Sequence, residues 1–557
     1  MSDFLFSLLA FAGERAKDSF VRKTRQMQAV QERFLKHHLQ YHQTTEVGRQ
    51  YNVGNISSID EFRDRVPVSP YSAYEAYTER IASGETNILN PDPVVFMSRT
   101  SGSTGKRKMI PVTRRFQNSL GWPNLIAIGF ASAATRSRGK KVGRVIATNA
   151  AATPEITPGG IEFGSAATGV LRMGKFLYEQ LFVYPFEVLQ VKDVEARNYL
   201  CWLFSLQNTP KELAANFPMV ALQMCQYLEH FTESLLEDIE IGSISDRLKI
   251  EPQLRLALEN QLRPNPKRAA ELRSLLQMHG RLAPKFLWPD LSFVGTAQGG
   301  TSDFYLQRFP YYFGDISTFG VVYASAEGTF GIYHSLDDCS SVLAIDSGFY
   351  EFIPPEEWES DNPKTVLPWE VKPGEYYRLV CTNYSGFYRY DIGDVVEIGK
   401  FYNDVPTLIF RHRRGGLLSA FTEKTTEDHA TQTLKRLQQK FNVYLDDFCI
   451  TLSENDFPPA YIVNIELASG QTLADPQAFI AAFDRLLAEA NFYYGVKRKD
   501  GMIPPPRLRI LAPGSFAIVR QRHIEKGIPD YQLKFPHISE DRSLVADLEV
   551  KEEVAMV

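Results

Sequence analysis

Cysteine is scarce in this chain, and its few copies form no recognisable pattern. The 557 residues include only five cysteines, at positions 201, 225, 339, 381 and 449, and no two of them make a CxxC pair. A disulfide framework or a cysteine-based zinc site normally needs an even or closely spaced set. The sequence therefore argues against both and favours a reducing compartment, the cytoplasm.

An excess of charge of one sign is also missing. Lys and Arg number 61 against 66 Asp and Glu, which leaves a net charge of -5 without a basic block. Proteins that bind nucleic acid through its phosphates usually carry such a block. We therefore expect no nucleic-acid partner.

Long apolar runs are absent as well, so we expect no membrane span, which needs about 20 apolar residues. The stretch Phe4 to Ala12 is apolar, but no positive residues precede it and no obvious cleavage site follows. This pattern favours an amphipathic helix over a signal peptide.

What the sequence does contain is typical of a mixed α/β protein. Apolar residues at helical spacing predict helix within residues 1–45, and residues 175–280 are rich in helix formers. Pro93 to Met97 predicts a strand before a polar glycine loop, and residues 290–415 hold β-branched and aromatic runs. We expect a large N-terminal domain of β-sheets flanked by helices, residues 1–415.

The remaining residues, 416–557, are expected to form a small C-terminal α/β domain. Within it Pro476 to Ala490 predicts a helix, and Tyr461 to Leu467 and Arg507 to Leu511 predict strands.

Three histidines lie on the first helical stretch, His37, His38 and His42. His38 and His42 are four residues apart, a spacing that can hold a metal ion on one helix face. No HExxH pattern or third ligand stands nearby, so the sequence favours a solvated helix face.

A glycine-rich polar loop follows the strand predicted at residues 93–97. It consists of Thr100, Ser101, Gly102, Ser103, Thr104, Gly105, Lys106, Arg107 and Lys108. Glycines allow a close backbone approach to a phosphate, hydroxyls and N–H groups donate to its oxygens, and lysines neutralise its charge. The loop lacks the GxxxxGK[ST] pattern of a Walker A loop, and by itself it is equally compatible with a flexible surface turn.

Two further patches carry an aromatic or acidic side chain near glycine. In the run from Tyr323 to Gly328, a ring could stack on a base, and Glu327 could bind Mg²⁺ that bridges phosphates. In the run from Tyr388 to Asp394, a Gly-Asp turn could direct a carboxylate to the hydroxyls of a ribose. Taken singly, each patch is compatible with a purely structural turn.

In this order, the three patches resemble the core signatures of adenylate-forming enzymes, and the first has their T-S-G-[ST]-T-G-x-x-K form. More specifically, the chain resembles the auxin-responsive Gretchen Hagen family of acyl acid amido synthetases. The likeness runs along nearly the whole chain. It includes residues 61–68, 74, 79–85, 110–113, 157–160, 236–239, 287–291, 350–354 and 423–427.

The resemblance implies an adenylate-forming fold, ATP and Mg²⁺ as cofactors, and the following roles. The loop residues Thr100 to Gly105, with Lys106 or Lys108, would hold the ATP phosphates. Tyr323 would lie by the adenine with Ala324 and Ser325 beside it, and Glu327 would act in catalysis by binding Mg²⁺. Asp394 would bind the ribose, with Arg413 as a helper near the domain hinge. Lys534, in the Q-x-K-x-P run from Gln532 to Pro536, would stabilise charge at the α-phosphate.

The resemblance also implies the reaction. A small carboxylic acid would be activated as an acyl-adenylate and transferred to the amine of an amino acid, with a mobile C-terminal lid reorienting between the two steps. Two alternatives stay open: an acid–thiol ligase that uses coenzyme A or a carrier protein, and an inactive relative that only binds a small acid. The sequence identifies neither the acid nor the amine, the base or the oligomeric state.

The chain departs from the family pattern at three places. His537 stands where the plant enzymes usually have arginine, Arg414-Gly415-Gly416 replaces their Lys-Asn-Val, and Ala-Ser-Ala-Glu replaces a run with two serines before the glutamate. None of these changes removes a group that the reaction requires.

Overall fold

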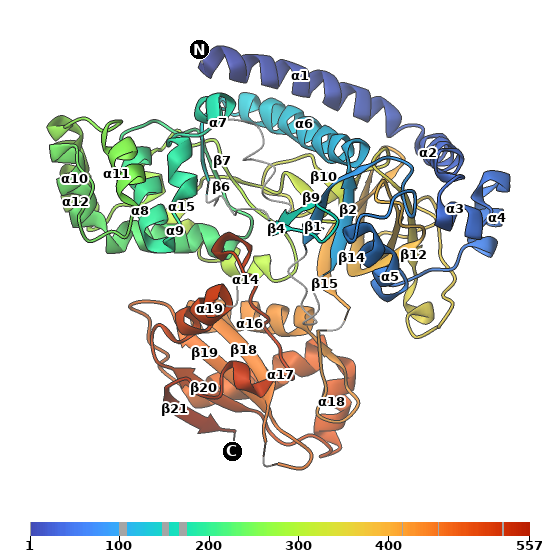
Figure 1. Cartoon of the computed structure of the whole chain (residues 1–557). Coiled ribbons are helices and arrows are strands. Elements are labelled where there is room, and N and C mark those ends of the chain that lie inside the picture. The colour runs from blue at the N-terminus through green and yellow to red at the C-terminus, as the bar shows by residue number, and fades with distance from the viewer. Residues whose placement is uncertain are drawn as a thin grey trace. The chain divides into compact units, whose positions relative to one another are not determined.

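The computed structural model describes residues 2–99, 108–147, 155–165, 175–414, 416–454, 456–525 and 528–556. The chain divides into two compact units, coloured along the sequence in Figure 1. The first unit comprises residues 1–298 and 310–410, and the second comprises residues 299–309 and 411–557. The expected mixed α/β fold with a large N-terminal part and a smaller C-terminal part is confirmed. The roles given to residues 1–415 and 416–557 stay predictions.

The N-terminal stretch forms two helices, α1 (Ser2–Lys23) and α2 (Met27–His42), and not one. Helix α1 lies along α6 (Arg114–Ser137) in the first unit (Figure 1). A Cβ added at Gly13 would lie 2.8 Å from the backbone nitrogen of Gly129, so the two glycines permit this close approach. The helices that follow are α3 (Glu46–Gln50), α4 (Ile59–Arg65) and α5 (Glu75–Ala82).

The expectation of a solvated histidine face on α2 is wrong for two of the three residues. His38 and His42 are buried, at 3% and 1% exposure, whereas His37 is exposed. The ring of His38 meets the buried ring of Tyr388 edge-on, with centroids 5.8 Å apart. Burial lowers the pKa of both buried imidazoles, so they pack as neutral aromatic rings.

The described part of the first unit contains three sheets. The largest has seven strands in the order β12-β13-β14-β15-β11-β10-β9, and the pairs of known register are antiparallel. Its strands are β9 (Val322–Ser325), β10 (Gly328–Tyr333), β11 (Ser341–Leu343), β12 (Phe349–Ile353), β13 (Tyr376–Thr382), β14 (Tyr390–Tyr402) and β15 (Val405–Arg413). This sheet carries the second and third sequence patches.

The two other sheets of the first unit have four strands each. One has the order β2-β1-β5-β4, and its strands are β1 (Val94–Arg99), β2 (Met109–Thr113), β4 (Glu155–Ile156) and β5 (Glu162–Ser165). Strand β1 is the strand predicted from Pro93 to Met97. The other sheet is parallel, in the order β3-β6-β7-β8, with β3 (Val145–Ala147), β6 (Glu212–Ala214), β7 (Phe293–Gly295) and β8 (Thr318–Phe319).

The region from 175 to 280, predicted to be helical, is mostly helical but also contains the short strand β6, and the helical part extends slightly beyond it. It holds α7 (Lys175–Leu181), α8 (Val194–Ser205), α9 (Pro218–His230), α10 (Thr232–Ile241), α11 (Pro252–Glu259), α12 (Pro266–His279) and α13 (Pro284–Leu287), and α15 (Phe309–Phe313) follows later. Helices α9, α11, α12 and α13 carry proline in their first turn, where its missing N–H costs no hydrogen bond.

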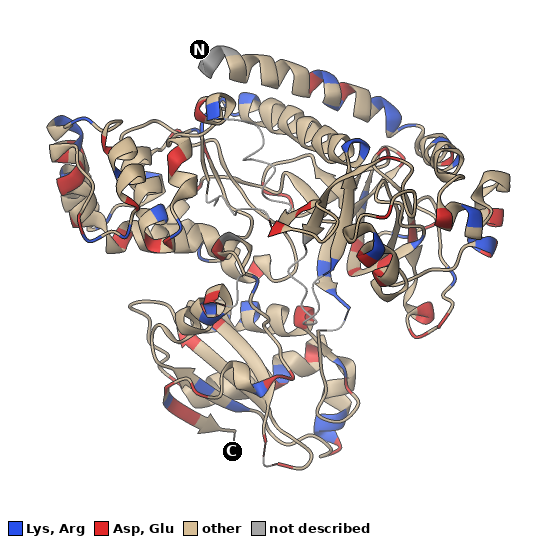
Figure 2. Cartoon of the chain, viewed as in Figure 1, with Lys and Arg blue, Asp and Glu red and all other residues tan. Residues whose placement is uncertain are grey.

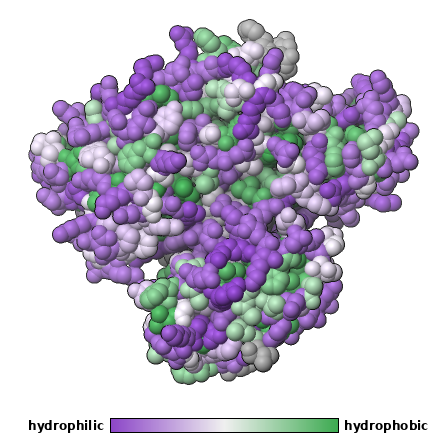
Figure 3. Space-filling view, turned by 180° about the vertical axis from the view of Figure 1, so that it is seen from behind, coloured by the Kyte–Doolittle hydropathy of each residue, from purple (hydrophilic) through white to green (hydrophobic). Residues whose placement is uncertain are grey.

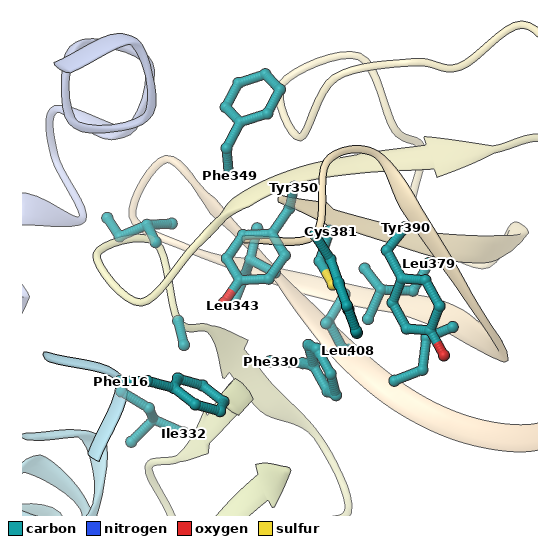
Figure 4. Packing of buried hydrophobic residues seen from close by; sticks show 14 of the residues in the cluster. Phe116, Phe330, Ile332, Leu343, Phe349, Tyr350, Leu379, Cys381, Tyr390 and Leu408 are labelled. Carbon is teal, nitrogen blue, oxygen red and sulfur yellow. The ribbon is translucent and has the colours of Figure 1, made fainter. Parts of the chain in front are cut away.

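The core of the first unit lies against the seven-stranded sheet. Figure 4 shows Phe330, Tyr350 and Cys381 among its buried side chains, with Phe116 of α6 at its margin. Tyr390 also belongs to this cluster, and its ring is fully buried. The sheet that carries the candidate site residues is therefore fixed by packing on its apolar face.

The second unit is built on a four-stranded sheet in the order β18-β19-β20-β21. Its strands are β18 (Leu445–Leu452), β19 (Tyr461–Leu467), β20 (Arg507–Leu511) and β21 (Val550–Ala555), and a small pair is formed by β16 (Leu417–Leu418) and β17 (Thr425–Thr426). Its helices are α14 (Ser302–Leu306), α16 (Glu427–Phe441), α17 (Pro476–Ala490), α18 (Phe492–Lys499) and α19 (Ser515–Glu525). The predicted helix and both predicted strands are confirmed.

Local sequence explains why α16 begins where it does. The Thr426 hydroxyl accepts from the backbone of His429, and the His429 ring accepts from the backbone of Thr426, which makes a reciprocal capping box. The buried residues Ala430, Leu434 and Leu437 then recur at helical spacing.

Both units have mixed surfaces. In the view of Figure 2, acidic and basic residues are interspersed along the described chain. Hydrophobic residues on the face shown in Figure 3 form scattered patches between hydrophilic ones. Within the described ranges, no helix combines the length and apolar character needed to cross a membrane.

Candidate active site

Glu327 occupies the turn of the hairpin between β9 and β10. Ser325 pairs with Gly328 across the hairpin, which leaves a two-residue turn of Ala326 and Glu327. The carboxylate is almost fully buried, at 1% exposure, and its Oε2 accepts from the Ser325 hydroxyl at 2.6 Å. The backbone N–H of Glu327 donates to the same Ser325 oxygen at 3.2 Å. The Ser-Ala-Glu-Gly sequence thus holds the carboxylate against its own strand.

Tyr390 of β14 contacts the second carboxylate oxygen, and Lys108, the residue before β2, contacts Tyr390. The Tyr390 hydroxyl donates to Glu327 Oε1 at 3.2 Å, and the Lys108 ammonium donates to the Tyr390 oxygen at 3.1 Å. The same ammonium lies 5.4 Å from the ring centroid of Tyr71 and 5.8 Å from that of Tyr390, a cation–π arrangement. Lys108, Tyr390 and Glu327 therefore form one hydrogen-bonded row that starts at the end of the glycine-rich loop.

Asp394 lies in a bulge of β14. Val395 pairs with Arg378 and Asp391 pairs with Val380, so three residues of β14 stand opposite one of β13. Gly393 takes a φ of +82° within this bulge, a conformation that glycine adopts without strain. Asp394 is left buried at 2% exposure, and its Oδ2 accepts from the Tyr323 hydroxyl at 2.7 Å.

These contacts join strands that are not neighbours in the sheet. Strands β15 and β11 separate β14 from β10, yet the side chains of β14 reach both Tyr323 and Glu327. The sheet must therefore curl, so that β14 and the β9–β10 hairpin face each other. Asn383 supports this arrangement, because its amide donates to the backbone oxygen of Glu327 at 2.8 Å.

Among the described residues, the site combines the buried carboxylates of Glu327 and Asp394 with the ammonium of Lys108. Burial and then the negative charge of Glu327 raise the pKa of the Cys381 thiol, and Asp394 adds to the effect. The thiol is therefore neutral and unsuited to act as a nucleophile at neutral pH.

The donor set around Glu327 fits a magnesium ion shared with phosphates. Mg²⁺ is usually held by one or two carboxylates together with phosphate oxygens, and it rarely sits in an all-protein cage. The described residues offer one buried carboxylate here and no cluster of three or more His, Cys, Asp or Glu side chains. Both oxygens of Glu327 accept hydrogen bonds from neutral hydroxyls, and a cation could bind to these same carboxylate oxygens.

The structure brings together five of the predicted site residues, namely Lys108, Tyr323, Ser325, Glu327 and Asp394, within the first unit. Ala324 lies on β9 between Tyr323 and Ser325 and is exposed. The predictions for Thr100, Ser101, Gly102, Ser103, Thr104, Gly105 and Lys106 lie outside the described residues. The roles assigned to all of these residues stay predictions.

Arg413 and Lys534 belong to the second unit. Arg413 is the last residue of β15. Lys534 is exposed and stands between Leu533 and Phe535, both of which are 5% exposed.

Sequence reasoning missed Tyr390 and Asn383. Tyr390 lies inside the third patch, but nothing in that patch indicates a contact with Glu327, 63 residues earlier. Asn383 lies outside every patch. Only the curl of the sheet places both residues beside the hairpin.

Comparison with protein-family models extends over most of the chain. Residues 16–318 match the GH3 family N-terminal domain, residues 341–413 match the GH3 family central domain, and residues 428–543 match the GH3 family C-terminal domain. Lys108 falls within the first match and Asp394 within the second, whereas Tyr323, Ser325 and Glu327 lie between the two.

Individual relatives align over most of their lengths. The chain is 28% identical over 506 residues to an indole-3-acetic acid-amido synthetase, GH3.10, of Arabidopsis thaliana, covering 84% of this chain and 83% of the relative. It is 27% identical to a jasmonoyl–L-amino acid synthetase, GH3.5, of Oryza sativa subsp. japonica, covering 94% of each protein.

Solved structures share the fold. The GH3.15 acyl acid amido synthetase superposes with a TM-score of 0.85 at 22% identity, covering 97% of both chains. A 2-hydroxyisobutyryl-CoA ligase superposes with a TM-score of 0.53 at 13% identity, covering 93% of this chain and 90% of the other. These superpositions confirm the adenylate-forming fold. The three family-model matches confirm the family resemblance found in the sequence, and the chain belongs to the GH3 family.

Proposed function

We propose that the protein is an ATP-dependent acyl acid amido synthetase that joins a small carboxylic acid to the amine of an amino acid. The observation that carries the proposal is membership of the GH3 family across all three of its domains. The two curated relatives described above are named as amino acid-conjugating synthetases. The buried row from Lys108 through Tyr390 to Glu327 supplies polar groups suited to binding a nucleotide and a cation.

The first step of the reaction gives the acyl group a better leaving group. A carboxylate is a poor acyl donor because oxide would have to leave. One carboxylate oxygen attacks the α-phosphorus of ATP and pyrophosphate departs, which gives an acyl-adenylate. The amine nitrogen then attacks the acyl carbon, AMP departs with the bonding electrons, and the amine loses a proton to a base, leaving an amide.

In this proposal, different residues of the first unit bind the ribose, the adenine and the phosphates of ATP. Asp394 is suited to accept from ribose hydroxyls, because its carboxylate is buried and held by the Tyr323 hydroxyl. The Tyr323 ring would lie by the adenine, and Lys108 and the loop of residues 100–106 would bind the phosphates. Glu327 would hold Mg²⁺, which, when bound, neutralises charge on the phosphate oxygens.

Lys534 would supply positive charge at the α-phosphate during adenylation. Charge stabilisation in a site that excludes water is commonly the largest catalytic contribution. Arg413 would assist near the junction of the units. In this proposal, residues 416–557 act as a lid that keeps water from the acyl-adenylate.

Location and partners complete the proposal. The five cysteines are thiols, and four of them are buried, which suits a reducing compartment such as the cytoplasm. The partners are the two small substrates, without nucleic acid or membrane.

Acid-dependent exchange of labelled pyrophosphate into ATP tests the first half of the reaction. Aromatic, indolic, jasmonate-like and fatty acids are offered singly to the purified protein. We expect one class to support exchange, and we expect the rate to fall at least about a hundredfold in Glu327→Ala and Lys534→Ala. Lys551→Ala, at an exposed position of β21, serves as the matched control for lysine loss. Exchange that is equal with and without every acid would refute the proposal.

A further inference from the structure

The segment that carries Lys534 lacks the hydrogen-bond ladder of a helix or strand. Residues 533–536 have no regular secondary structure, and a single bridge joins Ile538 to Ile450 of β18. Burial alternates along the segment: Leu533, Phe535 and His537 are buried, whereas Lys534 is exposed. In an extended chain alternate side chains point to opposite sides, so the buried residues hold the segment and present Lys534 outward.

His537 is the most extensively held of these buried residues, at 0% exposure. Its Nε2 lies 3.3 Å from Asp447 Oδ1 and 3.2 Å from the Tyr305 hydroxyl, which itself donates to Asp447 Oδ1 at 3.0 Å. The backbone N–H of His537 donates to Glu427 Oε1 at 2.9 Å. Its ring stacks on Phe448, with centroids 4.1 Å apart. Side chains from α14, β18 and the Lys534 segment thus meet at one point.

Two arginines pair with the aspartates beside His537. Asp446 pairs with Arg308 at 2.8 Å, and Asp447 pairs with Arg520 at 3.4 Å. Burial opposes the charge of Arg520, but Asp446 and Asp447 outweigh it and raise the pKa of the guanidinium. An ionised carboxylate can only accept, so the hydrogen on Nε2 of His537 is placed toward Asp447.

We propose that His537, Asp447 and Tyr305 form a positioning anchor that fixes the backbone of the Lys534 segment for adenylation. This inference rests on the proposed function, because Lys534 acts on ATP only if the chain forms an acyl-adenylate. His537 is three residues from Lys534 and does not touch the substrate, so it is a positioning residue. A displacement of a catalytic group by about 1 Å can slow a reaction roughly a hundredfold.

Three variants separate the anchor from general packing. His537→Leu removes the donor but keeps apolar bulk, His537→Gln keeps an N–H donor, and Tyr305→Phe removes one hydroxyl. Tyr444→Phe, at a 40% exposed position of the second unit, is the matched control for hydroxyl loss. We expect kcat for acid-dependent exchange to fall roughly 10- to 100-fold in His537→Leu, less in Tyr305→Phe, and to recover largely in His537→Gln.

A double-mutant cycle tests whether His537 acts through Lys534. In a Lys534→Ala background the further change His537→Leu should leave the residual exchange rate unchanged, because the group that it positions is gone. A loss as large as that in the wild-type background would overturn the inference and make His537 a residue of the fold alone. Wild-type exchange rates in His537→Leu would overturn it as well.

Hydrogen–deuterium exchange tests the anchor independently of activity. The backbone N–H groups of His537 and Ser539 are hydrogen-bonded, to Glu427 and Ile450 respectively, and should be protected. Protection of residues 533–539 should be lost in His537→Leu while α17 stays protected. Unchanged protection in His537→Leu would contradict the anchor, whatever the enzyme activity. A lack of acid-dependent pyrophosphate exchange in the wild-type protein would instead count against the proposed function.

Discussion

The pair formed by Arg389 and Glu351 should be the most sensitive ionic contact of the first unit. Both side chains are buried, at 4% and 1% exposure. All five N–H groups of Arg389 have acceptors at 2.7–3.0 Å: both oxygens of Glu351, the backbone oxygens of Arg63 and Val66, and the Thr365 hydroxyl. Glu351→Ala would remove two of these acceptors and leave the guanidinium charge buried without its partner.

The expected loss is large because a buried charge cannot be rehydrated without opening the core. Removing one partner of a buried ion pair typically costs about 3–5 kcal/mol, and we expect that loss for Glu351→Ala. Glu351→Gln keeps one oxygen as an acceptor, so it should cost less, about 1–3 kcal/mol. Arg389 lies in the third patch, directly before Tyr390, so both changes should also loosen the site.

Urea unfolding followed by tryptophan fluorescence measures this loss of stability in the first unit, which contains both Arg389 and Glu351. All five tryptophans, at positions 122, 202, 288, 358 and 369, belong to the first unit. Glu356→Ala, an exposed neighbour, is the matched control and should stay within about 0.5 kcal/mol of wild type. A loss of less than about 1 kcal/mol for Glu351→Ala would refute the argument that the pair is desolvated and mutually dependent.

Three further predictions concern the histidines and the site. The pKa of His38 lies well below its ordinary 6.5 because of burial, so the unfolded chain binds protons first as the pH falls, and the free energy of unfolding declines below pH 6.5. His38→Phe should flatten that decline, whereas the control His37→Gln should not. The free energy of unfolding is measured by urea titration between pH 7 and about pH 5. An equal dependence on pH in His38→Phe and in the wild type would contradict the assignment. Tyr390→Phe breaks the link between Lys108 and Glu327 and should slow acid-dependent pyrophosphate exchange about tenfold, whereas an unchanged rate would exclude a role for the link. Asp394→Asn should raise the KM for ATP about tenfold with little change in stability, and an unchanged KM would exclude ribose binding there.

Elements with strong local signals could be predicted from the sequence. Helix α17 begins and ends as predicted, because Asp475 caps it, proline occupies its first position, and Phe479, Phe483 and Leu487 recur on one face. The burial of His38 and His42 could not be predicted in the same way. It depends on Tyr388, about 350 residues later in the chain, and no local pattern reports that contact.

The candidate site likewise contains residues that could be predicted from the sequence and contacts that could not. Glu327 and Asp394 were singled out from the sequence, because the three patches in their order resemble a family whose site residues occupy these positions. The row from Lys108 to Glu327 passes through Tyr390, whose position depends on the strand order β14-β15-β11-β10 and on the curl of the sheet. Strand order is a tertiary property, so the sequence patches alone could not reveal this contact.

Direct identification of the product tests the central claim most sharply. The protein is incubated with ATP, Mg²⁺, the acid that supports exchange and a mixture of amino acids, with coenzyme A in a parallel reaction, and products are separated by mass spectrometry. The account predicts AMP together with a compound of the combined mass of acid and one amino acid less one water. An acyl thioester formed with coenzyme A, with no amide in the amino acid reaction, would contradict it.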